Sequence, residues 1–264
     1  MKAVNLNEVK ELYNIYSPLK TNFQLYTEFQ QIFGKNYNIE EENIRNTYNQ
    51  YITKNFINEN VVKSAFIKKY SLSKSPNHTI TIFEMNVGSS RADICMINGK
   101  SMVFEIKTEY DSFARLSKQL YDYKQVFEYI YIVVPEIKVD LAVTQIDENI
   151  GIIYYKQNRL GNIKFYEHKS PIYNKNINSF KQLNTLTKVQ LNKMVENSQN
   201  NKLELIKKIL NNYNHEEINI IFKEYFKEKY KNRWLYIHSH QKKLYSLDYQ
   251  WFFKNNIPIS TVYK

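Results

Sequence analysis

The sequence contains one cysteine, Cys95, among 264 residues. A lone thiol cannot form an internal disulfide and has no cysteine partner with which to build a structural zinc site. No run of about 18 apolar residues is present, so no segment is expected to span a bilayer. The first residues, MKAVNLNEVKELY, lack the apolar core of a signal peptide. These absences predict a cytoplasmic protein without a membrane partner.

The chain is basic, with a formal net charge of +11 and a sequence pI near 9.3. Such an excess favours an anionic partner, because positive potential raises encounter rates with polyanions. Residues 175–264 hold 16 Lys and Arg against 7 Asp and Glu, whereas residues 1–174 hold 21 against 19. The basic character therefore falls in the C-terminal third. Nucleic acid is the expected partner, because Glu224 and Glu228 interrupt the cationic face that a membrane surface would need.

Apolar spacing predicts helices at residues 6–16, 22–33, about 40–70 and 112–127. Short β-rich runs occupy residues 79–85, 92–97, 101–107 and 129–134, and 150–155 and 163–166 are expected edge strands. A strand-helix-strand return on one sheet is almost always a right-handed parallel crossover. We therefore expect an α/β fold with a mixed sheet flanked by helices. Its three segments are a helical extension (1–40), the α/β core (41–172) and a basic, mostly helical C-terminal domain (173–264).

Two carboxylates and one lysine carry the chemistry that the sequence predicts. Asp93 is followed after eleven residues by Glu105-Ile106-Lys107 on a hydrophobic strand. Residues two apart on a strand point to the same side, so Glu105 and Lys107 share a face. Phosphodiester hydrolysis needs a cation on the phosphoryl oxygens and a water made nucleophilic at neutral pH. We assign Asp93 and Glu105 to Mg²⁺, which binds few carboxylates and keeps several waters, and Lys107 to the attacking water or the developing charge.

This spacing resembles the PD-(D/E)xK, or restriction-endonuclease-like, nuclease superfamily, although Ala92 stands where a proline is usual. The resemblance covers about residues 59–155 and is closest to a group of small bacterial members. It implies an α-β-β-β-α-β core, with Gln119 facing the active site and counted among the catalytic residues. It also implies a further metal-binding carboxylate, for which Glu59 on the preceding helix and Glu84 are the candidates. The full pattern is Arg91-x-Asp93, Glu105-Ile106-Lys107, Asp111, Arg115, Gln119 and Tyr123.

Several of these residues have a second interpretation. Arg91 is either a phosphate contact or an ion-pair partner of Glu84. Asp111, Arg115, Gln119 and Tyr123 recur every four residues and are expected on one helix face, where the first two could form an intrahelical ion pair. Beyond the core, cations mixed with aromatics are expected to position a polynucleotide. The predicted nucleic-acid contacts are Arg91, Arg115, Tyr123, Lys227, Lys231, Arg233, Lys242 and Lys243.

The turn between the second and third strands tests the assignment. Asn98-Gly99 is a strong signal for a two-residue hairpin, which would pair Asp93 with Phe104 and turn Asp93 away from Glu105. A shared site therefore requires a one-residue irregularity. We expect either a three-residue loop, Ile97-Asn98-Gly99 with Gly99 left-handed, or a bulge near Asp93.

These features predict a Mg²⁺-dependent nuclease, with Mn²⁺ as a substitute metal and DNA preferred over RNA as substrate. A homodimer would suit double-strand cutting, although nothing in the sequence requires one. By analogy alone, a role in phage defence or mobile-element biology is compatible with such a protein. The alternatives are a nuclease-fold protein that binds nucleic acid without cutting it, and an RNA-cleaving effector or toxin.

Overall fold

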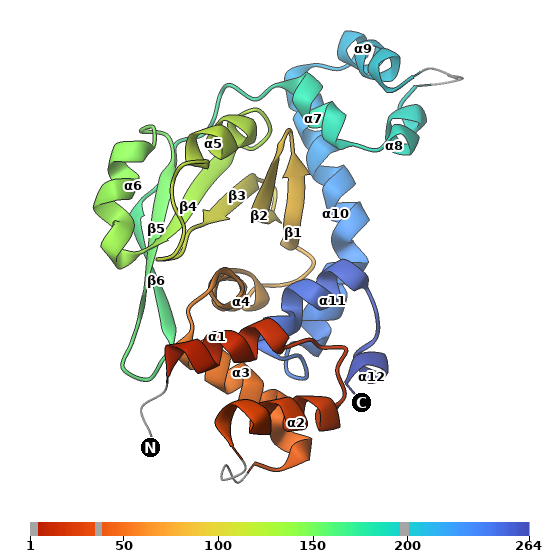
Figure 1. The fold of residues 1–264 in the computed structure, drawn as a ribbon. Coiled ribbons are helices and arrows are strands. Elements are labelled where there is room, and N and C mark those ends of the chain that lie inside the picture. Colours follow the sequence, from red (N-terminus) through yellow and green to blue (C-terminus); the bar gives the residue numbers. More distant parts are fainter. Residues whose placement is uncertain (1–4, 35–38, 196–200, 264) are drawn as a thin grey trace. The chain divides into compact units, whose positions relative to one another are not determined.

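The computed structural model describes residues 5–34, 39–195 and 201–263 (Figure 1). The chain divides into two units, the first comprising residues 1–73, 156–165 and 235–264 and the second residues 74–155 and 166–234. This division differs from the three consecutive segments expected from the sequence, because N-terminal, central and C-terminal pieces contribute to one unit. No helix in the described part of the chain is both long and apolar enough to cross a bilayer.

The first unit is mainly helical. Asn58 explains why the helix expected over residues 40–70 is broken: its side-chain oxygen accepts from Val61 N at 3.0 Å and begins a new helix. The helices at residues 6–16 and 22–33 are confirmed. The elements of this unit are α1 (Leu6–Ile15), α2 (Asn22–Phe33), η1 (Glu41–Asn43), α3 (Ile44–Asn55), α4 (Glu59–Ile67), η2 (Lys68–Leu72), η4 (Ser246–Asp248), α11 (Tyr249–Asn255) and α12 (Ile259–Val262).

Helices α1 to α4 share a core with the C-terminal segment. Leu247 packs into the same apolar cluster as Leu12, Phe29 and Ile52, all of which are buried. The adjacent Asp248 is 1% exposed, and its Oδ2 accepts from Tyr16 Oη at 2.8 Å and Tyr263 Oη at 2.5 Å. A buried carboxylate requires such donors. These contacts join pieces of the first unit that lie far apart in the sequence.

The second unit is built on a sheet whose strands follow the order β1-β2-β3-β4-β5-β6. The pairs β1-β2 and β2-β3 are antiparallel, whereas β3-β4 and β4-β5 are parallel. The expectation of a mixed sheet with helices is therefore confirmed. The strands are β1 (Ile80–Val87), β2 (Ser90–Ile97), β3 (Ser101–Ile106), β4 (Tyr129–Pro135), β5 (Gly151–Gln157) and β6 (Ile163–Lys169).

Helix α5 (Leu116–Lys124) connects β3 to β4 and contacts β2 and β4 (Figure 1). It is shorter than the expected helix over residues 112–127, because residues 113–116 form a turn in which Leu116 N donates to Phe113 O at 2.9 Å. A short helix between β4 and β5 was not expected from the sequence. The other helices are η3 (Glu136–Lys138), α6 (Val139–Gln145), α7 (Ser179–Thr185), α8 (Lys188–Lys193), α9 (Lys202–Asn212) and α10 (His215–His240), the last of which continues into the first unit.

Asp248 makes the stability of the first unit depend on pH. Burial raises the pKa of its carboxyl from 3.8 to about 6, against the lowering effects of Tyr263, Tyr16 and Arg45. The folded state therefore holds this proton more tightly than the unfolded chain. The associated stability is fully present below pH about 3.8 and is lost as the pH rises through about 6.

The test compares the free energy of unfolding of the wild type with that of Asp248→Asn. We expect the difference, wild type minus variant, to fall by up to about 3 kcal/mol as the pH rises from 4 to 7.5. The Asn variant cannot titrate, so the difference isolates this carboxyl from the rest of the protein. Urea unfolding of both proteins across this range measures the difference. A difference that does not vary with pH would contradict the expectation.

Candidate functional site

The turn between β2 and β3 sets the register that brings the two carboxylates together. Ile97 pairs with Ser101, so the loop has three residues, with Asn98 N donating to Lys100 O at 3.0 Å. Gly99 adopts φ 88°, a left-handed conformation that glycine tolerates without steric cost. The expected irregularity is confirmed, although the loop is Asn98–Lys100 and begins one residue later than predicted.

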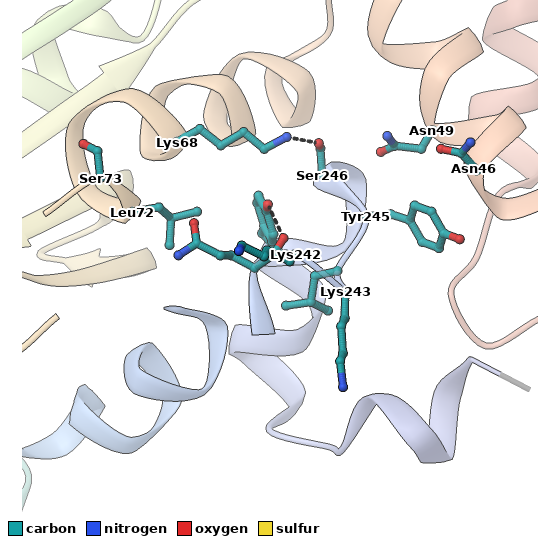
Figure 2. A pocket seen from close by; sticks show the side chains of 12 residues that line it. Asn46, Asn49, Lys68, Leu72, Ser73, Lys242, Lys243, Tyr245 and Ser246 are labelled. Carbon is teal, nitrogen blue, oxygen red and sulfur yellow. Dashed lines mark hydrogen bonds between the residues drawn. The ribbon is translucent and has the colours of Figure 1, made fainter. Parts of the chain in front are cut away.

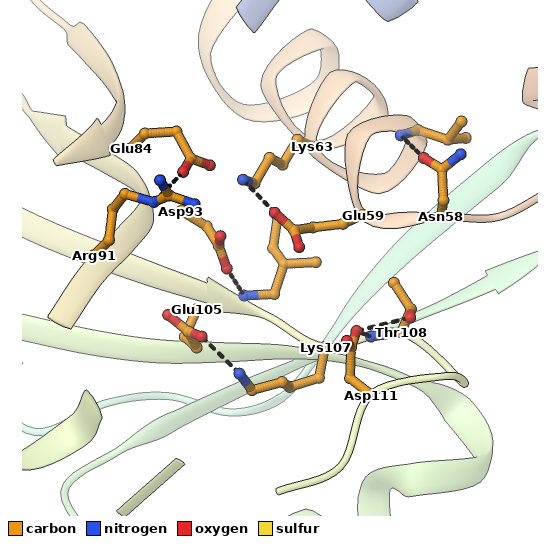
Figure 3. Close-up of polar contacts among 12 residues, drawn as sticks. Asn58, Glu59, Lys63, Glu84, Arg91, Asp93, Glu105, Lys107, Thr108 and Asp111 are labelled. Atoms are coloured by element: carbon orange, nitrogen blue, oxygen red, sulfur yellow. Dashed lines mark hydrogen bonds and ion pairs between the residues drawn. The ribbon is translucent and has the colours of Figure 1, made fainter. Parts of the chain in front are cut away.

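With this register, Asp93 and Glu105 occupy facing positions on neighbouring strands. The last pair in the ladder is Ile94 with Phe104, so the next residues along are Asp93 and Glu105. Facing residues of an antiparallel pair project to the same side of a sheet. Asp93 is 8% exposed and Glu105 is 2% exposed. Asp93 Oδ2 also accepts from Ile106 N at 2.7 Å, which ties its side chain to β3 (Figure 3).

Glu105 lies at the centre of a hydrogen-bond network in which both carboxylate oxygens are used. Its Oε1 accepts from Lys107 Nζ at 2.7 Å and Gln119 Nε2 at 2.5 Å, and its Oε2 accepts from Tyr123 Oη at 2.6 Å. Lys107 Nζ also donates to Gln119 Oε1 at 2.9 Å. A carboxylate this deeply buried is tolerated only with such donors. The network therefore fixes the orientation of Glu105 relative to Lys107.

Burial and nearby carboxylates both act on the ionisable groups beside this site. Burial is the main cause that raises the pKa of the Cys95 thiol well above its usual value, and the charges of Asp93, Glu105 and Glu84 add to it. Burial and the charge of Glu105 likewise raise the pKa of Tyr123. Two neighbouring groups thus stay protonated, mainly because they are buried and in part because of the carboxylate charges beside them.

Glu84 interrupts the ladder of β1 and β2 opposite Asp93. The pairs Phe83 with Ile94 and Met85 with Ala92 flank this position, and Glu84 has φ 54°, unusual for a residue with a side chain. Its Oε2 pairs with Arg91 Nε at 2.6 Å (Figure 3). The ion pair between Arg91 and Glu84 is therefore confirmed, whereas the contact of Arg91 with a phosphate stays a prediction.

Lys107 continues the line of β3 beyond the assigned strand. Its N–H donates to Val133 O at 2.8 Å, and the following Thr108 donates to Asp111 Oδ2 through both N and Oγ1 at 2.7 Å (Figure 3). Lys138 Nζ then donates to the carbonyl oxygens of Thr108 and Asp111 at 2.8 and 2.6 Å, and to that of Glu109. Sequence analysis missed Lys138 because nothing in the local pattern links residue 138 to this loop.

Two expectations for the helix after β3 are wrong. Tyr123 was assigned to nucleic acid, but its side chain is 0% exposed and donates to Glu105, so it supports the carboxylate from inside. Asp111 and Arg115 were expected on the face that carries Gln119, but α5 begins only at Leu116. Asp111 instead closes the preceding turn. Arg115 is exposed at the start of α5, and its contact with nucleic acid stays a prediction.

Glu59 is the first residue of α4 and belongs to the first unit. Its Oε1 pairs with Lys63 Nζ at 2.5 Å, an i,i+4 contact within the helix. The prediction that Glu59 binds the metal is untested, and so is the same prediction for Glu84.

The basic residues of the C-terminal region fall into two groups. Lys227, Lys231 and Arg233 lie on α10 in the second unit, whereas Lys242 and Lys243 lie in the first. Lys227 is 3.6 Å from Glu224, and Arg233 lies over the ring of Tyr230. Several interleaved aromatics, including Phe226 and Trp234, are buried and form core. The contacts of the five basic residues with nucleic acid stay predictions.

Comparison with known proteins relates the chain to a bacteriophage protein. The family model described as bacteriophage P4 protein cII matches residues 23–248. Protein cII of Enterobacteria phage P4 is 31% identical over 105 residues, and the matched stretch spans 39% of this chain and 39% of that protein. A Silicibacter pomeroyi protein of unknown function aligns over 37% of this chain and 63% of its own, with 12% identity and a TM-score of 0.29.

Removing the Tyr123 hydroxyl should destabilise the protein. Tyr123→Phe leaves Glu105 Oε2 without its buried donor, and we expect a loss of about 1.5 to 3 kcal/mol, the usual range for a hydrogen bond to a charged group. Tyr121→Phe, on the same helix but 64% exposed, serves as the control and should change stability little. Urea unfolding of the three proteins tests the expectation, and equal effects of the two substitutions would contradict it.

Proposed function

The chain belongs to the bacteriophage P4 protein cII family, and we propose that it is a metal-dependent nuclease whose chemistry depends on Asp93, Glu105 and Lys107. The observation that carries the proposal is the three-residue turn, which places two buried carboxylates at facing positions beside a buried lysine. We propose a restriction-endonuclease-like core as the finer description of the fold, and the order of β1, β2, β3, α5 and β4 supports it.

The donor set suits a hard divalent cation such as Mg²⁺ or Mn²⁺. Asp93 and Glu105 supply carboxylate oxygens, which these ions prefer. Glu105 Oε2 accepts one hydrogen bond among the described residues, from Tyr123, so a carboxylate oxygen with two lone pairs retains capacity there. A bound ion would supply charge neutralisation at the phosphoryl oxygens and would acidify a water.

The remaining residues orient these groups. Gln119 bonds to both Glu105 and Lys107, so it holds the carboxylate and the ammonium in one arrangement. Lys107 carries a positive charge that can stabilise negative charge on a phosphoryl group as the leaving oxygen departs. Tyr123 fixes the second oxygen of Glu105 from the buried side. Glu84, which lies opposite Asp93, has a left-handed backbone conformation with φ 54°. A strained conformation of this kind persists only where the surrounding structure enforces it.

Hydrolysis of DNA is the first test. In Mg²⁺ or Mn²⁺, we expect cleavage of plasmid and single-stranded DNA, with a rate lowered by about 10²-fold or more in Asp93→Asn and in Lys107→Gln. Both substitutions conserve side-chain size. Asp93→Asn also retains a side-chain oxygen that can accept the hydrogen bond from Ile106 N. Matched controls are Asp140→Asn and Lys118→Gln, which change exposed residues of the same unit and should retain the wild-type rate.

Parallel reactions with total RNA compare the two substrates. If only RNA is cleaved, RNA rather than DNA is the substrate. Binding without cleavage of either polymer, under every divalent ion supplied, would overturn the proposed activity and leave a nucleic-acid-binding protein.

Metal binding can be measured without activity. We expect Mg²⁺ or Mn²⁺ to raise the unfolding temperature, because a ligand that binds only the folded state stabilises it. The rise should disappear in Asp93→Asn and in Glu105→Gln and persist in Asp140→Asn. A thermal shift series with increasing metal tests this, and an equal rise in all four proteins would place the ion elsewhere.

A further inference from the structure

The positive charge of the protein is concentrated in the first unit. Its three sequence segments hold 16 Lys and Arg against 8 Asp and Glu, whereas the second unit holds 21 against 18. The sequence alone placed the excess in the C-terminal third. Folding groups only the lysines after residue 234 with basic residues from residues 1–73 and 156–165.

One pocket of the first unit is lined by lysines and neutral polar groups. Its volume is about 590 Å³, and Lys68, Lys242 and Lys243 are the charged residues that line it (Figure 2). No carboxylate contributes to its lining among the described residues. Asn49 Oδ1 accepts from Leu247 N at 3.3 Å, which leaves the NH₂ group of this amide as a donor toward a ligand.

A second pocket of the first unit has the same character. It has a volume of about 620 Å³, and its charged lining residues are Lys54, Lys68, Lys69 and Lys164, again with no described carboxylate. Lys68 and Ser246 line both pockets. The two pockets are therefore neighbours that share one lysine.

Lys68 at this junction is a cation without an acidic partner among the described residues. Its Nζ donates to Ser246 Oγ at 2.6 Å, as Figure 2 shows, and lies 5.7 Å from the centre of the Tyr249 ring. Burial lowers the pKa of the Lys68 ammonium, because the protein around it disfavours the charged form. A negatively charged ligand would offset this penalty and the mutual repulsion of the lysines.

We propose that the two pockets bind phosphate groups of one polynucleotide backbone. Six lysines from three separate segments converge there without a carboxylate, which matches a polymer of regularly repeated negative charges. A single free nucleotide would leave one pocket unfilled. A membrane surface would need a continuous apolar face opposite the cations, whereas these lysines line two concave pockets. The inference rests on the proposed function only in taking nucleic acid as the ligand.

Three of these lysines can be neutralised without removing a described contact. Lys164, Lys242 and Lys243 are exposed, and their side chains make no hydrogen bond or ion pair with any described residue. The test variant is therefore Lys164→Gln/Lys242→Gln/Lys243→Gln. Its matched control, Lys188→Gln/Lys207→Gln/Lys208→Gln, removes the same charge from exposed positions of the second unit.

The assay is fluorescence anisotropy of a labelled single-stranded oligonucleotide of about 20 residues, in EDTA and over a series of salt concentrations. The test variant should bind at least about tenfold more weakly at low salt. Each lost phosphate contact lowers the slope of log Kd against log salt by about 0.7, so three should lower it by about 2. The control variant should keep the wild-type affinity and slope, and circular dichroism should show that all three proteins are folded.

Wild-type affinity and slope in the test variant would overturn the proposal, as would an equal loss in the control. Vesicles containing phosphatidylserine form a separate arm, and loss of vesicle binding alone in the test variant would assign the pockets to a lipid surface instead. The assay contains no free divalent metal, so failure of the nuclease proposal leaves its result unchanged. Failure of the pocket proposal, in turn, leaves the effect of Asp93→Asn on cleavage to be judged separately.

Discussion

The candidate site depends on the need to satisfy a carboxylate that has been taken out of water. Glu105 is 2% exposed in the middle of a sheet, where an ionised group without partners would be strongly unfavourable. Lys107, Gln119 and Tyr123 meet that need from the same strand line and from α5. The contacts that satisfy this buried carboxylate are therefore the same ones that hold an acid and a cation at a fixed separation.

Much of this arrangement could be predicted from the sequence. The alternation of apolar residues gave the strands, and the period of two put Glu105 and Lys107 on one face. The conflict between an Asn98-Gly99 hairpin and a shared site required an extra loop residue, and Lys100 is that residue. Local patterns of this kind succeed because strand pairing and turn geometry are governed by nearby residues.

Contacts between distant segments could not be predicted. The spacing of Tyr123 indicated a face of α5 but not its depth, so a buried support for Glu105 was assigned to nucleic acid. Lys138 reaches the loop after β3 from η3, the short helix that follows β4, and no local pattern marks it. The lysines of the first unit were likewise dispersed over three segments, and only the fold shows which of them share a pocket.

The position of Leu247 and Asp248 in the core of the first unit bears on how the protein is made. The helices that they pack against are translated well before these two residues. During synthesis, α1 to α4 must wait with apolar surface exposed until the C-terminal segment leaves the ribosome. The strands of the second unit pair with near neighbours in sequence, so that unit can assemble while translation is still under way.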